Sequence, residues 1–297
     1  MPVFRFFTIV CSFAGSMLVA SCGGAAPRAV ASGHDDYGHA LVFGPPPRRI
    51  VSLNPTTTEI LFAIGAGYRL VGRSQYDVFP DSARLVPNVG PAMRPNIEAV
   101  IAARPDLVIL YASDDNHAAY DRLTAAHIPT YAFRIDSIAQ FERDTRVLGQ
   151  LLGDSARAAT TVDSIETTLQ HVRTLTAGLS HPGVFIHAWD KPIIAIGGGS
   201  FLSELIDIAG ARNVYADSKL PSLPVSLEDV ILRNPDFVLA SPVAAPKLRA
   251  SQSWSAIPAV RAGRILVYDT TLVGRPSVQL GAAAYSLARL IHPREVK

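Results

Sequence analysis

The longest amphipathic pattern in the chain runs from Asp154 to Gly178. Apolar residues recur there every three or four positions, which places them on one face of a helix. The stripe consists of Ala158, Val162, Ile165, Leu169, Val172, Leu175 and Leu179. Asp154 is a good N-cap, and Gly178 followed by Pro182 supplies a stop. At about 1.5 Å per residue the helix would span about 36 Å, which is longer than most globular helices.

Short apolar runs alternate with helical patterns on both sides of this helix. The strands expected before it are residues 50–53, 69–73, 107–111 and 130–133, and those expected after it are 184–187 and 193–196. Capping signals open helices between them, at Asn96 and at Ser137, where Gln140 completes a capping box. The alternation predicts doubly wound α/β structure with parallel sheets.

The two flanks of the helix also repeat one another. TEILFAIGA at 58–66 matches SELIDIAGA at 203–211, and IEAVIAARPDLVIL at 97–110 aligns without a gap to LEDVILRNPDFVLA at 227–240. The first match pairs Glu59 with Glu204. Two matching segments in the same order favour two similar lobes joined by one long helix over a single domain with an ordinary crossover helix. The expected boundaries are 48–153 for the first lobe, 154–179 for the helix and 180–297 for the second lobe.

The amino terminus has the pattern of an export signal. Arg5 is the only charged residue before an apolar run at 6–19, which is too short for a membrane-spanning helix. The run ends in Val-Ala-Ser-Cys22, which resembles the lipobox of bacterial lipoproteins and implies lipidation of Cys22 after removal of residues 1–21; the alternative is an ordinary signal peptide with a chance cysteine. The only other cysteine, Cys11, lies inside the signal, so the mature chain has no disulfide. Residues 22–47 are rich in Gly, Ala and Pro and predict a flexible tether.

Composition excludes several classes of protein. The chain has 297 residues, 48% of them hydrophobic, which is a globular composition. Its 27 basic and 25 acidic residues form no basic cluster, so nucleic-acid binding is not expected. Gly197–Ser200 lacks the Gly-Lys-Ser/Thr of a phosphate loop, and no G-x-S-x-G or H-E-x-x-H motif is present. We therefore expect no catalytic residues, no cofactor and no metal site; a secreted α/β enzyme is the competing class.

With these segments in view, the chain resembles substrate-binding proteins of ABC importers, in the cobalamin, haem and ferric-siderophore class with a helical backbone between the lobes. The resemblance covers residues 48–292 and implies a ligand cleft between the lobes. It also implies that one glutamate from each lobe docks on arginines of the permease; by position these are Glu98 and Glu228. Each follows a plausible N-cap by two residues, at Asn96 and Ser226. The alternative role is a favourable interaction with the helix dipole.

Within that class the spacing is most similar to the cobalamin binders. The implied ligand contacts are Tyr76 in the first lobe and the loop Thr271, Leu272, Val273, Gly274 and Arg275 in the second. Tryptophans typical of the turns before the docking helices are absent here; Met93 and Leu223 stand in those turns, and Trp189 offers another flat surface.

Two other ligands remain open within the resemblance. Haem would take Tyr76, His117 or His187 as an axial ligand, and a ferric siderophore would be held by Arg94, Lys191 or Arg275. The resemblance implies a monomer in the periplasm or at the cell surface that is attached to the membrane only by its lipid. Such a protein captures a corrinoid or other metal chelate and delivers it to an ABC permease with ATPase subunits. The long helix predicts only a small lobe closure, because a hinge needs residues free to change φ and ψ.

Overall fold

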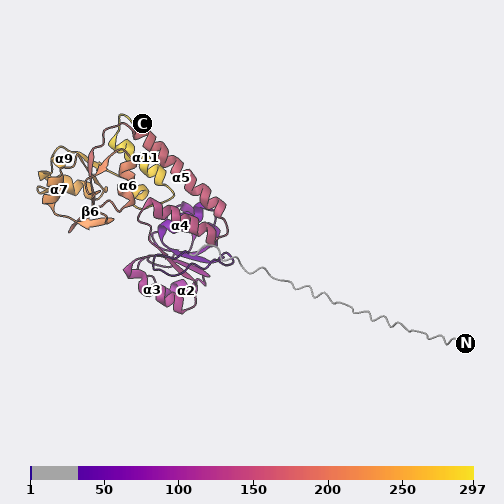
Figure 1. Cartoon of the computed structure of the whole chain (residues 1–297). Helices are drawn as coiled ribbons and strands as arrows, with labels where there is room; N and C mark the ends of the chain where they lie inside the picture. Colours follow the sequence, from indigo (N-terminus) through magenta and orange to yellow (C-terminus); the bar gives the residue numbers. More distant parts are fainter. Residues whose placement is uncertain (2–32) are drawn as a thin grey trace. The chain divides into compact units, whose positions relative to one another are not determined.

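The computed structural model describes Met1 and residues 33–297, so the predicted signal peptide and Cys22 lie outside the described residues. The first lobe, coloured indigo to magenta in Figure 1, is built on a four-stranded parallel sheet. The order of its strands is β2-β1-β3-β4. Its strands are β1 (Ile50–Leu53), β2 (Leu70–Arg73), β3 (Leu107–Tyr111) and β4 (Thr130–Phe133). Its helices are α1 (Pro55–Ala63), α2 (Ile97–Ala102), α3 (Asp114–Ala125) and α4 (Ile138–Leu151).

The second lobe carries a mixed sheet of order β10-β9-β5-β6-β8, with β7 paired to β5. Its strands are β5 (Gly183–Asp190), β6 (Ile193–Ile196), β7 (Arg212–Asn213), β8 (Ser222–Pro224), β9 (Phe237–Ala240) and β10 (Ile265–Val267). Its helices are α6 (Phe201–Ile208), α7 (Leu227–Arg233), α8 (Ala244–Ala250), α9 (Pro258–Arg261), α10 (Thr270–Val273) and α11 (Leu280–Ile291). The predicted α/β class is confirmed, but only β10, β9, β5 and β7 pair in parallel. Because β5 turns back through Lys191 and Pro192, β6 and β8 extend the sheet in antiparallel fashion.

The predicted connector is helix α5 (Ser155–Thr176), which packs along α4 of the first lobe and α6 and α11 of the second (Figure 1). The Asp154 side chain accepts a hydrogen bond from the Arg157 backbone, and Gly178 has a φ of +82°. The predicted stripe is buried from Ala158 to Val172. The prediction is wrong at Leu175, which is 40% exposed. Thr176, one turn after Val172, is buried instead and donates its hydroxyl to the Ile208 carbonyl at 3.0 Å.

One hydrophobic cluster joins the helix to both lobes. Ile165 and Leu169 of α5 belong to the same cluster as Ile50 of β1 and Val184 of β5. A continuous apolar core across the connector leaves no solvated joint between the lobes at this point.

The internal repeat is visible in the two lobes. Gly65 after α1 and Gly210 after α6 have φ angles of +77° and +79°, a left-handed conformation that favours glycine at the end of a helix. The paired segments at 97–110 and 227–240 form α2 with β3 and α7 with β9. The similarity of the segments therefore reflects equivalent places in two similar folding units.

The expected tether at 22–47 does not match the structure from residue 33 onward. Asp35 is 4% exposed and accepts a hydrogen bond from the Ala132 backbone at 3.0 Å, while the Asp36 backbone donates to the Ala132 carbonyl at 2.9 Å. The Tyr37 hydroxyl donates to the Ser113 carbonyl at 2.5 Å. The physical reason is that β4 is an edge strand, whose free backbone groups this segment covers. Within residues 33–297 no helix is long and apolar enough to cross a bilayer.

Candidate functional site

A hollow of about 290 Å³ lies between the two lobes at the carboxyl ends of the first lobe's strands. In open α/β sheets, ligands bind at the carboxyl ends of parallel strands. The first lobe contributes Asn54, Pro55, Thr56, Tyr111, Ile135 and Asp136, and the second contributes Ser200, Phe201, Pro221, Gly274, Arg275 and Pro276. We refer to this hollow as the cleft floor.

The amino terminus of α1 organises the cleft floor. Asn54 caps the helix by accepting a hydrogen bond from the Thr56 backbone at 3.1 Å. The Thr56 hydroxyl donates across the cleft to the Pro276 carbonyl at 2.8 Å. Two residues on, the Thr58 hydroxyl donates to a carboxylate oxygen of Asp77 at 2.6 Å. The first turn of α1 therefore makes side-chain hydrogen bonds to residues of both lobes.

A buried ion pair also crosses between the lobes. Oε1 of Glu59 accepts hydrogen bonds from Nε and Nη2 of Arg275 at 2.8 and 2.5 Å, and only 1% of the Glu59 side chain is exposed. Burial raises the pKa of Glu59, and the neighbouring Arg275 charge acts in the opposite direction. Arg275, predicted as a ligand contact, lines the cleft floor. The sequence analysis did not predict Glu59 as the ion-pair partner of Arg275.

Asp136 is the acidic side chain on the cleft floor. Its Oδ1 accepts a hydrogen bond from the Tyr111 hydroxyl at 2.8 Å. Burial, followed by the hydrogen bond to Asp136, raises the pKa of Tyr111, so that this hydroxyl stays protonated and donates. Neither Tyr111 nor Asp136 was a predicted site residue. The two are 25 positions apart, and no periodic pattern in the sequence indicates a contact over that separation.

Tyr76 projects from the loop that follows β2, with 57% of the residue exposed. The loop is held by Asp77, which is 1% exposed and accepts hydrogen bonds from the Ser74 hydroxyl at 2.5 Å and the Ser74 backbone at 3.2 Å. Burial raises the pKa of Asp77, and its hydrogen bonds to Ser74 and Thr58 oppose the shift. An exposed ring on a fixed loop at the carboxyl edge of the sheet is suited to contact a ligand.

Met93 lies in a turn at the same edge and is 37% exposed. The buried Asn116 fixes this turn: its Nδ2 donates to the carbonyls of Ala92 and Tyr111, each at 3.0 Å, and its Oδ1 accepts from the Arg94 backbone at 3.0 Å. The Arg94 side chain is paired with Asp115 at 2.6 Å.

The expected contact loop at 271–275 is partly helical. Asp269 caps α10 by accepting a hydrogen bond from the Thr271 backbone at 2.8 Å. Thr271 is exposed, Leu272 packs against the core, and Gly274 lines the cleft floor. Val273 is fully buried, so the structure removes its side chain from the predicted contacts. Leu223 is half-buried in β8 and packs against the core of the second lobe.

Trp189 lies apart from the cleft floor. It is 66% exposed and, with Lys191, Val243 and Lys247, lines a second hollow of about 650 Å³. This second hollow has no lining residue in common with the cleft floor. His187 is buried there, with Nε2 at 2.9 Å from a carboxylate oxygen of Asp190, and burial lowers its pKa.

The other histidine considered as a haem ligand is also engaged. The His117 ring stacks on that of Tyr37 with centroids 4.2 Å apart. Among residues 33–297, no group of three or more His, Cys, Asp or Glu side chains is arranged to hold a metal ion.

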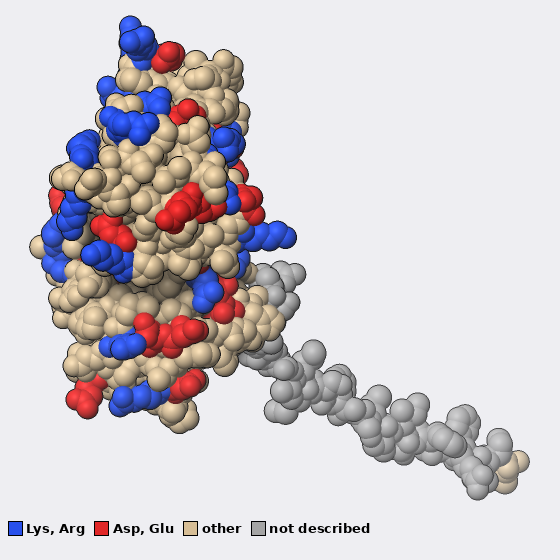
Figure 2. Space-filling model, turned by 90° about the vertical axis from the view of Figure 1, so that its left-hand side faces the viewer, with Lys and Arg blue, Asp and Glu red and all other residues tan. Residues whose placement is uncertain are grey.

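Glu98 and Glu228 occupy the first turns of α2 and α7 and are exposed. Asn96 and Ser226 cap these helices through their side chains, as predicted. In the described part of the chain neither glutamate makes an ion pair. On the face in Figure 2, acidic and basic side chains are intermixed, with no extended field of one sign.

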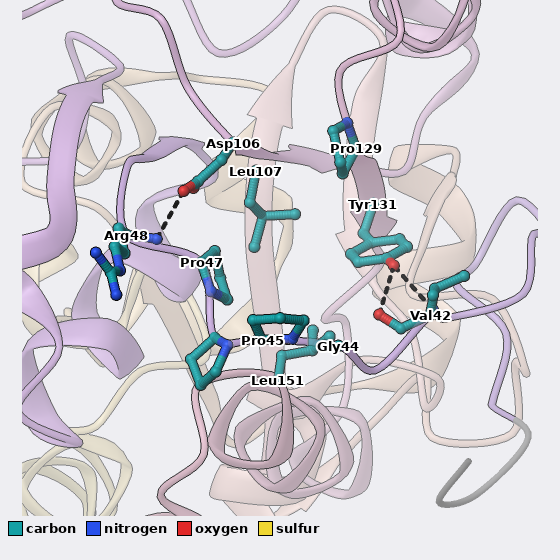
Figure 3. A pocket seen from close by; sticks show the side chains of 11 residues that line it. Val42, Gly44, Pro45, Pro47, Arg48, Asp106, Leu107, Pro129, Tyr131 and Leu151 are labelled. Carbon is teal, nitrogen blue, oxygen red and sulfur yellow. Dashed lines mark hydrogen bonds between the residues drawn. The ribbon is translucent and has the colours of Figure 1, made fainter. Parts of the chain in front are cut away.

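A third hollow, of about 440 Å³, lies at the opposite edge of the first sheet (Figure 3). It is formed by the proline segment at 45–47, Leu107 at the start of β3 and Pro129 before β4. The Arg48 backbone donates to Asp106 at 2.8 Å, and the Val42 backbone donates to the Tyr131 hydroxyl at 2.9 Å. Because these are the amino ends of the strands, the hollow is at the wrong edge for a ligand site of this fold.

The glycine run before α6 has a packing role. A Cβ atom on Gly197 would lie 2.2 Å from the Leu220 carbonyl oxygen, and one on Gly199 would lie 2.2 Å from that of Lys219. The loop therefore needs glycine for its close approach to residues 216–220, which accounts for its resemblance to a phosphate loop.

Comparison with known proteins agrees with this architecture. Residues 50–272 match the model of a periplasmic binding protein family. A vitamin B12-binding protein of Yersinia pestis (strain Pestoides F) is 31% identical over 196 residues, covering 65% of this chain and 69% of that protein. The solved periplasmic vitamin B12 binding protein of Vibrio cholerae aligns with a TM-score of 0.72 and 24% identity over 84% of this chain and 98% of its own. The periplasmic haem-binding protein of Roseiflexus sp. RS-1 aligns with a TM-score of 0.74 and 25% identity, covering 84% of this chain and 99% of that one.

The two lobes, the connecting helix, the cleft between the lobes and the family match over residues 50–272 lead to one conclusion. The chain belongs to the periplasmic binding protein family.

Proposed function

We propose that this protein captures a corrinoid, such as cobalamin, outside the cytoplasm and delivers it to an ABC permease whose partner subunits hydrolyse ATP. The observation that carries the proposal is the cleft floor, to which Thr56 of one lobe and Arg275 of the other both contribute. Its polar groups are fixed by neighbours, while Tyr76 and Met93 supply exposed apolar surface at the same edge of the first sheet. A few placed polar groups beside apolar surface are typical of small-molecule sites.

The similarity to a vitamin B12-binding protein supports the corrinoid over the other ligands of the class. Of the three side chains considered for an axial bond to haem iron, His187 is buried and the exposed His117 is stacked on Tyr37, whereas Tyr76 is exposed and stacks on no described ring. Of the three basic side chains considered for a siderophore, Arg94 and Arg275 are already paired with carboxylates. We assign Tyr76, Met93, Thr271, Gly274 and Arg275 as ligand contacts, with Trp189, Leu223 and Leu272 at the margin.

The test is a titration of the purified protein with cyanocobalamin, haem and a ferric hydroxamate, followed by calorimetry and absorbance. We expect cyanocobalamin to bind with micromolar affinity or better. Saturable binding of haem or of the hydroxamate without any binding of cyanocobalamin would refute the corrinoid assignment, and turnover of any of the three would favour an enzyme.

We further propose that the mature protein is held at the membrane by a lipid on Cys22 and that Glu98 and Glu228 dock on the permease. The docking role is supported by two exposed carboxylates on equivalent helices, neither of which pairs with a residue at 33–297. Cells given a labelled fatty acid should transfer it to the wild-type protein and not to Cys22→Ser; equal labelling of both would contradict the anchor.

A further inference from the structure

The cleft floor presents a hydrogen-bond donor, Arg275, whose charge is offset by Glu59, and a hydrogen-bond acceptor, Asp136. Arg275 uses Nε and Nη2 on Glu59, and within residues 33–297 its Nη1 makes no hydrogen bond. Asp136 uses Oδ1 on Tyr111, and no described residue donates to its Oδ2. Arg275 and Asp136 line the same small hollow, so each has one polar atom without a partner among the described residues beside the space that a ligand would enter.

The balance of charge around this hollow is not positive. Arg275 and Asp136 are the charged side chains lining it, and Glu59 lies directly behind the arginine. Asp77, in the loop after β2, is buried and bonded to Thr58 of α1, and it adds no positive charge. Arg134 lies outside the lining residues, although its charge acts on Tyr111 and its Nε donates to the Ala112 carbonyl. Among the lining side chains and the partner of Arg275, one guanidinium is opposed by two carboxylates, so a carboxylate on the ligand would be repelled by Asp136 and only weakly attracted by the neutralised Arg275.

We infer that the cleft floor is a carboxamide site and that Glu59 is a specificity-determining residue, because it neutralises Arg275 and so disfavours ligands that place a carboxylate there. A primary carboxamide offers a carbonyl to Nη1 and an N–H to Oδ2 of Asp136. This inference rests on the proposed function, since corrinoids carry peripheral carboxamides where haem carries carboxylates.

The internal repeat supplies a matched control. Glu204 is the repeat partner of Glu59 and also reaches the other lobe, where its Oε1 accepts a hydrogen bond from the Ile138 backbone at 3.1 Å. It makes no ion pair with an arginine in the described part of the chain, although the charge of Arg173 acts on it. Glu204→Gln keeps an acceptor for Ile138 and changes no guanidinium, whereas Glu59→Gln removes the charge that balances Arg275.

The experiment uses cyanocobalamin and its monocarboxylic acids, in which one carboxamide is hydrolysed to a carboxylate. The wild-type protein should bind at least one acid isomer about tenfold more weakly than the parent amide. In Glu59→Gln this preference should shrink by about tenfold, since the arginine charge is released, while Glu204→Gln keeps the wild-type ratio. Asp136→Asn, at a half-buried site, should shift the ratio in the same direction as Glu59→Gln and provides the test if Glu59→Gln does not fold.

The outcomes separate the two proposals. If the wild-type protein does not bind cyanocobalamin, the proposed function fails, and preferential binding of haem would overturn the carboxamide site with it. If cyanocobalamin binds but all acid isomers bind equally well, or if neither Glu59→Gln nor Asp136→Asn changes the ratio, the carboxamide site alone is overturned.

Discussion

Asp106 and Asp236 make the same backbone connection in the two lobes. The Asp106 backbone donates to the Arg49 carbonyl at 2.8 Å, and the Asp236 backbone donates to the Gly183 carbonyl at 2.7 Å. Their carboxylates accept hydrogen bonds from backbone N–H groups at the start of the first strand of each lobe. Asp106 accepts from Arg48 and Arg49, which precede β1, and Asp236 accepts from Gly183, the first residue of β5. The repeated Pro-Asp pair therefore ties each central strand to its neighbour.

Replacing either aspartate by alanine should destabilise the protein. Because Asp106 accepts two backbone hydrogen bonds and Asp236 one, we expect Asp106→Ala to cost about 2 kcal/mol of unfolding free energy and Asp236→Ala about 1 kcal/mol. Denaturant unfolding measures both. Asp81→Ala is the control, since this exposed residue makes only a 3.8 Å ion pair with Arg84 and should change stability by less than about 0.5 kcal/mol. Equal effects of all three would contradict the assignment.

Tyr76 should matter for binding and not for stability. Its ring is largely exposed on a loop fixed by Asp77, so Tyr76→Ala should weaken cyanocobalamin binding about tenfold by removing aromatic contact. Tyr76→Phe should bind as the wild type does. Calorimetry gives the affinities, and thermal unfolding should give the same midpoint for all three proteins. A large loss of affinity in Tyr76→Phe would point to a role of the hydroxyl instead.

The predictable part of the fold is the part written in short-range patterns. Continuous apolar runs located β1 and β3, and capping residues located the starts of α2, α4 and α5. The prediction for the end of the apolar stripe on α5 was wrong. Thr176 is polar, but it can be buried in place of Leu175 because its hydroxyl donates a hydrogen bond to the Ile208 carbonyl.

The cleft was less predictable for a related reason. Glu59 and Arg275 are 216 positions apart, and each acquires its role from the other. A buried polar residue such as Asp77 gives no periodic signal, since its partners come from a separate helix and its own loop. The segment at 34–43 looked like linker because its ordering depends on the edge of β4, which composition does not reveal.

Asp144 should make stability depend on pH. Burial, opposed by the hydrogen bond and charge of Arg143, raises the pKa of this carboxyl from 3.8 to about 7, and its side chain is fully buried. Between these two values the native protein holds a proton that the unfolded chain has lost. Stability from this group is therefore fully present below about pH 4 and is lost as pH rises through about 7.

The measurement is urea unfolding of the wild type and of Asp144→Asn, which cannot ionise, at pH 5 and pH 8. Relative to the variant, the wild type should be about 1 to 3 kcal/mol more stable at pH 5 than at pH 8. Comparing the two proteins cancels the titration of other groups. A difference that stays constant between the two pH values would show that Asp144 keeps its proton, or loses it, equally in both states.

Glu98→Ala with Glu228→Ala should separate docking from binding. Both carboxylates are exposed and away from the cleft floor, so cyanocobalamin affinity should be unchanged while uptake by cells falls at least about tenfold for the pair. Each single variant should have a smaller effect. Asp121→Ala with Glu295→Ala removes two other exposed acids and controls for net charge. Loss of ligand affinity in the first pair, or equal loss of uptake in the second, would contradict a docking role.

Ligand binding should close the lobes only slightly, because the contacts that join them lie on the cleft floor as well as along α5. The Phe201 backbone donates to the Asp136 carbonyl at 2.7 Å, Thr56 bonds to the Pro276 carbonyl, and Glu59 pairs with Arg275. Opening the cleft widely would break these contacts and part an apolar core shared by both lobes. X-ray scattering with and without cyanocobalamin should therefore give nearly superimposable curves. Glu59→Gln with Thr56→Val removes two of the links and should show the larger change; a large rotation already present in the wild type would mean that the links yield on binding.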